Sequence, residues 1–189
     1  MKRRVVVTGL GALTPLGNSV SESWAGAVAG KSGIGPITRF DATAFASRIA
    51  GEIKNFDPSQ YVDKKEARRL DNFALYTIAA SQMAMEDAAL TIGPSIAERV
   101  GVIIGSAIGG VATFEKEVIV VYNSGPRKLS PFAVPSILAN LASGHVSMRF
   151  GAKGPINCAV TACASGTSAI GDSYKIIAYG DADAMIAGG

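Results

Sequence analysis

The sequence lacks the features that mark membrane, secreted and metal-binding proteins. No apolar run approaches the roughly 18 residues of a membrane span. The apolar run after Met1–Arg4 is too short for a signal peptide. Cys158 and Cys163 are the only cysteines and His145 is the only histidine, so neither a disulfide framework nor a metal-ligand spacing is present. We therefore expect a soluble, cytoplasmic protein with no metal site and no membrane contact.

Charge and aromatic residues are also scarce. The chain is 17% charged and 7% aromatic, and its formal net charge of +3 is too mild to indicate nucleic-acid binding. By contrast, 48% of residues are hydrophobic and 22 are glycine, which fits a Gly/Ala-rich α/β interior. A length of 189 residues predicts about one domain with a sizeable core.

Short apolar runs alternate with helical stretches, which predicts a parallel sheet with right-handed crossovers. The predicted buried strands are Val5–Thr8, Val100–Ile104, Ile156–Val160 and Ala184–Ala187. The predicted helices are Ser21–Ala29, a long one from Lys64 through Ala89, Thr113–Tyr122, Ser136–Phe150 and one that Gly180 stops after Tyr179. Residues 34–58 read as a connector with one short strand at Ser47–Ile53. Three prolines predict an extended or looped segment at Gly125–Pro135.

The stretch Gly154–Gly171 places the thiol of Cys163 where a strand gives way to a helix. Unpaired N–H groups and the positive end of the helix dipole at such a corner stabilise a thiolate. Small neighbours would admit a carbonyl substrate, and backbone N–H groups could hold its oxyanion. The alternative is a cysteine that merely packs as a small hydrophobic residue. Cys158, inside the predicted strand, is better explained as core.

Several motifs occur in an order that resembles the β-ketoacyl-acyl-carrier-protein synthases, the condensing enzymes of fatty-acid synthesis, and most closely the type II synthases. They are Arg4–Gly17, Gly105–Gly110, Gly125–Ser136, Asn157–Gly171 with its Thr-Ala-Cys-Ala-Ser-Gly core, and Tyr179–Gly189. The resemblance implies a thiolase-like layered αβαβα architecture. Residues 1–189 would be an incomplete first half, and the second half, which carries two histidines in this family, is absent from the sequence. His145 matches neither of them.

The resemblance also implies an activity. Cys163 would take an acyl group from acyl carrier protein, and decarboxylation of malonyl-carrier protein would yield a carbanion that extends the chain by two carbons. This chemistry demands no cofactor, and the intact enzyme is expected to be a homodimer. Without the second half, we expect this chain to be unable to complete the condensation. A polyketide-type ketosynthase and a non-catalytic partner subunit of the same fold remain alternatives.

Further residues match family positions. Ile108 corresponds to a lining residue of the acyl pocket, although the glycines around it would equally suit a simple strand exit. Phe132 and Ala133 correspond to residues that cross the dimer interface into the partner's pocket. Because family members often carry a second phenylalanine at the latter position, Ala133 is expected to leave room for a longer or branched chain. The carrier-docking surface corresponds to the cations Lys65, Arg68, Arg69, Arg127 and Lys128, for which a solvated helix face is the alternative.

Overall fold

The centre of the fold is a parallel sheet of three strands, in the order β4–β3–β5. The computed structural model describes residues 3–189. Strand β3 (Val100–Ile104) lies between β4 (Ile156–Asn157) and β5 (Ala184–Gly188). Ile103 of β3 is opposite Asn157 on one side and Ala187 on the other. All five residues of β3 are buried, as expected of an apolar strand in a parallel sheet that is covered on both faces.

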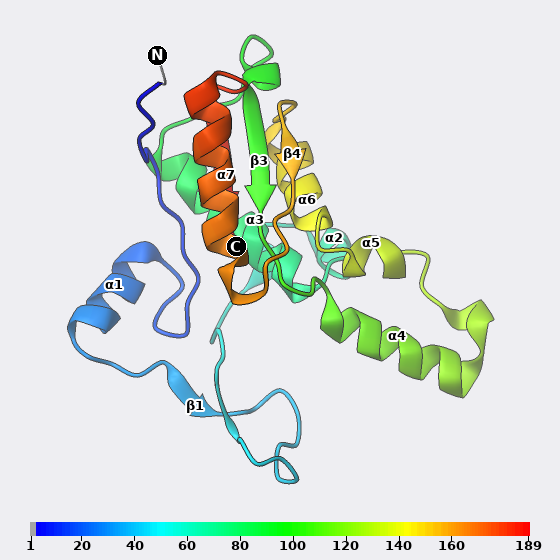
Figure 1. Ribbon diagram of the computed structural model, residues 1–189. Helices are drawn as coiled ribbons and strands as arrows, with labels where there is room; N and C mark the ends of the chain where they lie inside the picture. Colours follow the sequence, from blue (N-terminus) through cyan, green and yellow to red (C-terminus); the bar gives the residue numbers. More distant parts are fainter. Residues whose placement is uncertain (1–2) are drawn as a thin grey trace.

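Helices cover the two faces of this sheet (Figure 1). Helix α7 (Ser165–Tyr179) packs on β3 and β5 from one side. Helix α6 (Leu141–Phe150) packs on β3 from the other side, with α3 (Asn72–Asp87) against α6. The main hydrophobic core lies between the sheet, α3 and α6, and its buried members are Met85, Val100, Val102, Ile104, Ala142, Val146, Ala152 and Ile186.

The remaining elements lie around this core. Helix α1 (Val20–Val28) begins at Ser19, whose hydroxyl accepts a hydrogen bond from the Glu22 N–H group. An antiparallel pair, β1 (Ile34–Pro36) and β2 (Ile49–Gly51), follows. The other helices are α2 (Lys64–Ala67), α4 (Val111–Ser124) and α5 (Ala133–Ile137), with single 3₁₀ turns at Pro58–Gln60, Ala97–Arg99, Pro126–Lys128 and Ala162–Ala164. None of the helices between residues 3 and 189 is long and apolar enough to span a bilayer.

The expected strand at Val5–Thr8 is wrong. No strand of the structure includes these residues, and Val6 and Val7 are 60% and 77% exposed. The segment instead runs along α3, where the backbone at Gly9 and Gly11 lies so close to Ala84 and Ala80 that a Cβ would collide with their carbonyl oxygens. A strand forms only where a neighbouring strand completes its hydrogen bonds, and no strand lies beside this segment in the part of the chain described.

Two expected helices are interrupted. The helix expected from Lys64 through Ala89 breaks after α2, because the Asp71 carboxylate accepts a hydrogen bond from the Phe73 N–H group and caps the start of α3. The helix expected at Ser136–Phe150 is split into α5 and α6. Helix α5 also corrects the looped segment predicted at Gly125–Pro135, because Pro135 lies in its first turn, where a missing N–H costs no hydrogen bond.

Strand β4 is shorter than the expected Ile156–Val160, and the buried hydroxyl of Ser143 explains why. The Val102 N–H group donates directly to the Pro155 carbonyl, as in a regular ladder. At the next step the Ser143 Oγ atom lies between the strands. It accepts from the Ile104 N–H group at 2.9 Å and donates to the Asn157 carbonyl at 2.6 Å. The hydroxyl thus replaces one rung of the ladder.

We predict that Ser143→Ala destabilises the fold by about 1–3 kcal/mol, because the Ile104 N–H and Asn157 carbonyl groups would stay buried without their partner. Urea denaturation measures the free energy of unfolding. Ser124→Ala, at an exposed position near the end of α4, is the control and should change it by less than about 0.5 kcal/mol. Equal free energies of unfolding for the two variants would contradict this role, because the Ile104 N–H group would then bond the Asn157 carbonyl without the hydroxyl.

The carboxylate of Asp183, just before β5, accepts hydrogen bonds from two arginines. Arg99 donates from Nε at 3.1 Å and from Nη2 at 2.9 Å, and Arg3 donates from Nη1 at 2.5 Å. The hydrogen bonds from Arg99, followed by that from Arg3, hold the pKa of Asp183 well below its usual 3.8. A carboxyl whose pKa is lowered by folding stabilises the fold above its unfolded pKa and loses that contribution as the pH falls.

We therefore predict that wild-type protein loses stability more steeply than Asp183→Asn as the pH is lowered from 5 to 2. The free energy of unfolding, measured by urea denaturation at each pH, gives the two slopes. Asp172→Asn is the matched control, because Asp172 is paired only with Lys175 at the surface. Identical slopes for wild type and Asp183→Asn would rule out the linkage.

Candidate functional site

A sharp corner between β4 and α7 carries the candidate nucleophile. The chain turns through the 3₁₀ turn Ala162–Ala164 directly into the first residue of α7, Ser165. The buried Ser165 hydroxyl accepts from the Thr161 N–H group at 3.0 Å and donates to the Ala162 carbonyl at 2.7 Å. The Thr161 and Ser168 hydroxyls lie 2.9 Å apart and share a hydrogen bond. These side chains tie the incoming chain to the first turn of the helix.

The residue before Cys163 has a strained backbone. Ala162 has a φ of 52°, in the left-handed region that a Cβ disfavours by roughly 1–2 kcal/mol. Strain of this kind persists only where the surroundings impose it, and here the Ser165 hydroxyl binds the carbonyl of the strained residue itself. The strained turn leaves the next residue, Cys163, exposed.

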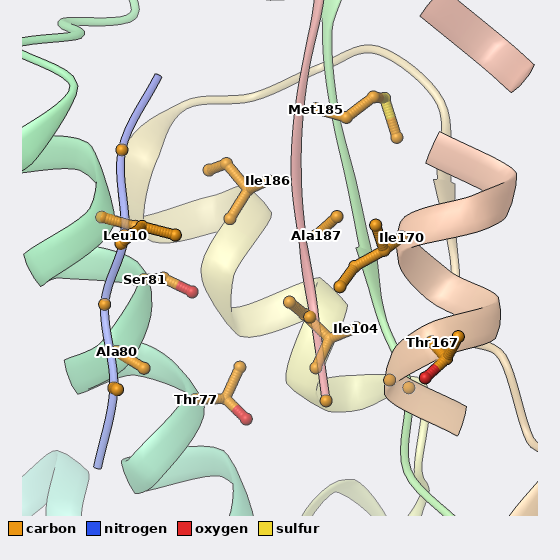
Figure 2. Close-up of a pocket in the computed structure, with 18 of the residues that line it drawn as sticks. Leu10, Thr77, Ala80, Ser81, Ile104, Thr167, Ile170, Met185, Ile186 and Ala187 are labelled. Carbon is orange, nitrogen blue, oxygen red and sulfur yellow. The ribbon is translucent and has the colours of Figure 1, made fainter. Parts of the chain in front are cut away.

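Cys163 lines a cavity of about 1050 Å³. Figure 2 shows its walls: Leu10 from the N-terminal segment, Thr77, Ala80 and Ser81 from α3, Ile104 from β3, Thr167 and Ile170 from α7, and Met185, Ile186 and Ala187 from β5. Cys163 thus lies at the carboxyl-end edge of the parallel strands, where ligands bind in open α/β sheets.

The electrostatics at this corner favour negative charge. Cys163 precedes a helix of 15 residues that has no acidic side chain in its first turn. The unpaired N–H groups and dipole of such a helix start stabilise an anion. A thiolate could attack a thioester carbonyl here, with backbone N–H groups to receive the oxyanion. Among residues 3–189, no group of three or more His, Cys, Asp or Glu side chains could hold a metal ion.

The second thiol differs from the first. Cys158 is half-buried, its Sγ atom lies 3.8 Å from the Ala159 carbonyl oxygen, and it does not line the cavity. Burial raises the pKa of the Cys158 thiol, which keeps it in the less reactive protonated form. These features match a packing role.

His145 does not meet Cys163 in this structure. It lies on α6 and does not line the cavity. Its Nε2 atom is buried without a hydrogen-bond partner among the residues described, and burial lowers its pKa. The chain therefore contains no Cys–His pair at the corner.

The residues expected in the acyl pocket lie outside the cavity that Cys163 lines. Ile108 is 68% exposed in the loop between β3 and α4. Phe132 is 39% exposed, and Ala133 is buried in α5. A hydrogen bond from the Gly110 N–H group to the Ile137 carbonyl ties the Ile108 loop to the end of α5. The structure thus groups these three positions at one place, and the contribution of Phe132 and Ala133 to a partner's pocket stays a prediction.

The cations expected in the docking surface fall into two clusters. Lys65, Arg68 and Arg69 are exposed on α2 and the turn after it, which meets the start of α4 through the hydrogen bonds of Asp71 to Thr113. Arg127 and Lys128 are exposed directly after the other end of α4. Helix α4, which has 14 residues and is therefore about 21 Å long, runs between the two clusters.

Sequence reasoning missed the residues that build the corner and one contact made by the first of the two cation clusters. The roles of Thr161, Ala162 and Ser165 had only a weak signal, the run of small residues around Cys163. No signal in the sequence indicated the contact between the guanidinium of Arg69 and the ring of Phe132, whose centroid is 4.3 Å from the Arg69 Cζ atom.

Comparison with known proteins decides the family. A model of the β-ketoacyl synthase N-terminal domain matches residues 2–189. The chain belongs to the β-ketoacyl synthase family. It is 50% identical to 3-oxoacyl-[acyl-carrier-protein] synthase 2 of Synechocystis sp. over 188 residues, and 50% identical to the Staphylococcus aureus (strain COL) protein of the same name over 187 residues. The two matches include 100% and 99% of this chain, but the chain spans only 45% of the length of each of those proteins.

Solved ketosynthase structures share the fold, which confirms the thiolase-like α/β architecture expected from the sequence. The ishigamide ketosynthase/chain length factor superimposes with a TM-score of 0.85 at 31% identity over 96% of this chain and 46% of that one. A β-ketoacyl synthase from Burkholderia phymatum gives 0.82 at 30% identity, over 96% and 45%. A type II polyketide ketosynthase, solved in complex with its acyl-carrier protein, gives 0.83 at 27% identity, over 96% and 49%.

Proposed function

We propose that this β-ketoacyl synthase chain provides the acyl-accepting half of a type II 3-oxoacyl-acyl-carrier-protein synthase in fatty-acid synthesis. The supporting observation is the position of Cys163, exposed beside a helix start and lining a cavity. Its thiolate attacks the thioester carbonyl of an acyl-carrier protein. The oxyanion then collapses, the bond to the carrier sulfur breaks, and the carrier leaves as a thiolate that takes a proton from water, while the acyl group remains on Cys163.

We propose that the second reaction, decarboxylative condensation with malonyl-carrier protein, needs groups beyond residues 1–189. The enolate formed from malonyl thioester requires hydrogen-bond donors or cations near its oxygen. The only histidine, His145, does not line the cavity. In this proposal residues 1–189 form the first half of the layered architecture and accept the acyl group, but cannot extend it by two carbons on their own.

The alternatives are less well supported. A polyketide-type ketosynthase is favoured by the fold neighbours at 27% and 31% identity, but the 50% identity to the fatty-acid synthases outweighs them. A non-catalytic partner subunit would have no need of a strained corner that exposes a thiol. No cofactor is required by the chemistry proposed, and we place the protein in the cytoplasm, where thiols stay reduced.

We propose that the partner is an acidic acyl carrier protein that docks on the two basic clusters. The five exposed cations would attract its carboxylates and raise the rate of encounter. A related ketosynthase has been solved in complex with its acyl-carrier protein, which supports a partner of this class.

We propose that a second copy of the chain covers α4. Glu117 is the only buried residue of this helix, whereas Val111, Phe114, Val118 and Tyr122 are between 51% and 89% exposed. Their spacing of three and four residues places them on one face. An exposed apolar stripe of this kind marks an interface, and the proposed homodimer would bury it.

The acyl-transfer step predicts an adduct on one thiol. When wild-type protein is mixed with an acyl carrier protein that carries a medium-chain acyl group, it should gain the mass of that acyl group. Intact-protein mass spectrometry measures the gain. Cys163→Ser should gain no thioester. The matched control, Cys158→Ala, should be acylated at the wild-type rate. Acylation that persists in Cys163→Ser, or that is lost in Cys158→Ala, would contradict the assignment of the nucleophile.

The proposed dimer predicts that Val118→Asp weakens self-association at least about tenfold, because an acidic group would enter an apolar interface. Sedimentation equilibrium over a range of concentrations measures the dissociation constant. Lys116→Asp introduces the same acid elsewhere on α4 and serves as the control. A wild-type protein that remains monomeric, or equal effects of the two substitutions, would show that another polypeptide covers the stripe.

A further inference from the structure

Phe132 lies directly beneath the guanidinium of Arg69. The Cζ atom of Arg69 is 4.3 Å from the ring centroid, within the range of a cation–π contact. Arg3, Arg99 and Arg149 each use their guanidinium in an ion pair within the fold. The Arg69 guanidinium makes no hydrogen bond or ion pair within residues 3–189, although its side chain is held in place.

The backbones that carry these two side chains are also tied together. The buried Ser136 hydroxyl, on α5, donates to the Arg69 carbonyl oxygen at 2.6 Å. Phe132 is the residue immediately before α5. The hydrogen bonds of Asp71 to the N–H and hydroxyl groups of Thr113 then fix the same turn to α4. Two independent contacts therefore hold Arg69 and Phe132 close together. One is the hydrogen bond from the Ser136 hydroxyl to the Arg69 carbonyl, and the other is the contact between the two side chains.

The chemistry of a stacked guanidinium determines what it can bind. With the Cζ atom over the ring, the N–H groups at the edge of the planar guanidinium are left to bind a ligand. That edge matches the two oxygen atoms of a carboxylate, which arginine binds with parallel hydrogen bonds. A guanidinium already held in one orientation loses less conformational entropy when the carboxylate arrives.

We propose that Phe132 is a positioning residue for Arg69, holding the guanidinium so that its edge receives a carboxylate of an acidic carrier protein. This deepens the proposed docking function and rests on it. The proposed role of Phe132 within its own chain is additional to the expected contribution to the partner's pocket. The neighbouring Arg68 is exposed as well but has no ring contact among residues 3–189, so it provides an internal comparison.

The experiment measures the dissociation constant for an acyl carrier protein by titration calorimetry, on the protein expressed from its native gene. The variants are Arg69→Gln, Phe132→Leu and the double variant, with Phe132→Tyr to retain the ring face and Arg68→Gln to remove a cation without a ring. Phe132→Leu should weaken binding about two- to fivefold. Phe132→Tyr should bind like wild type. In the Arg69→Gln background, Phe132→Leu should have no further effect, whereas in Arg68→Gln it should keep its full effect.

The outcomes separate this inference from the docking proposal. If Arg69→Gln weakens binding but Phe132→Leu does not, docking stands and the positioning role is overturned. If Phe132→Leu weakens binding equally with and without Arg69, the ring acts on its own and the positioning role is again overturned. If Arg69→Gln and Arg68→Gln both bind like wild type, the docking surface is wrong and the inference falls with it.

Discussion

The site depends on one buried hydroxyl, that of Ser165. It accepts the N–H group of Thr161 and donates to the carbonyl of Ala162, and so spans the corner from one side to the other. Each of these hydrogen bonds contributes on the order of 1 kcal/mol, which is comparable to the strain of a left-handed alanine. The hydroxyl therefore offsets the cost of the turn that exposes Cys163. The strand before the corner and the helix after it determine where Cys163 lies, and the Ser165 side chain joins the two elements.

The sequence predicts most of the central layers, because their signals are local. Strand β3 is an unbroken apolar run, and it forms at the residues expected, Val100–Ile104. Helix α4 contains the predicted Thr113–Tyr122, and Gly180 ends α7 with a φ of 92° as its lack of a side chain permits. The segment Val5–Thr8 has an equally strong apolar pattern but does not form a strand. Strand formation also requires a neighbouring strand to pair with, and the pattern of the segment itself carries no information about that neighbour.

Other features could not be predicted because they depend on single side chains acting across the fold. The length of β4 is set by Ser143 on another helix, and the break between α2 and α3 by the cap at Asp71. At the site, the sequence predicts Cys163 from its place between an apolar run and a helical stretch, from its small neighbours and from the resemblance of Asn157–Gly171 to the condensing enzymes. The strain at Ala162 and the hydroxyl bonds of Ser165 require the backbone to be known. The stacking of Arg69 on Phe132 joins residues far apart in the chain, and periodicity carries no information about such a pair.

Part of the cavity wall consists of main chain alone. A Cβ on Gly105, after β3, would collide with the backbone of Ser165, and a Cβ on Gly189, after β5, would collide with the Gly166 backbone at the start of α7. Mutation therefore cannot reshape this floor, since any side chain there would push the corner apart. Changes in the shape of the cavity are confined to the walls that carry side chains, such as Thr77, Ile170 and Met185. The fold thus combines a main-chain floor of fixed shape beside Cys163 with side-chain walls that substitution can alter.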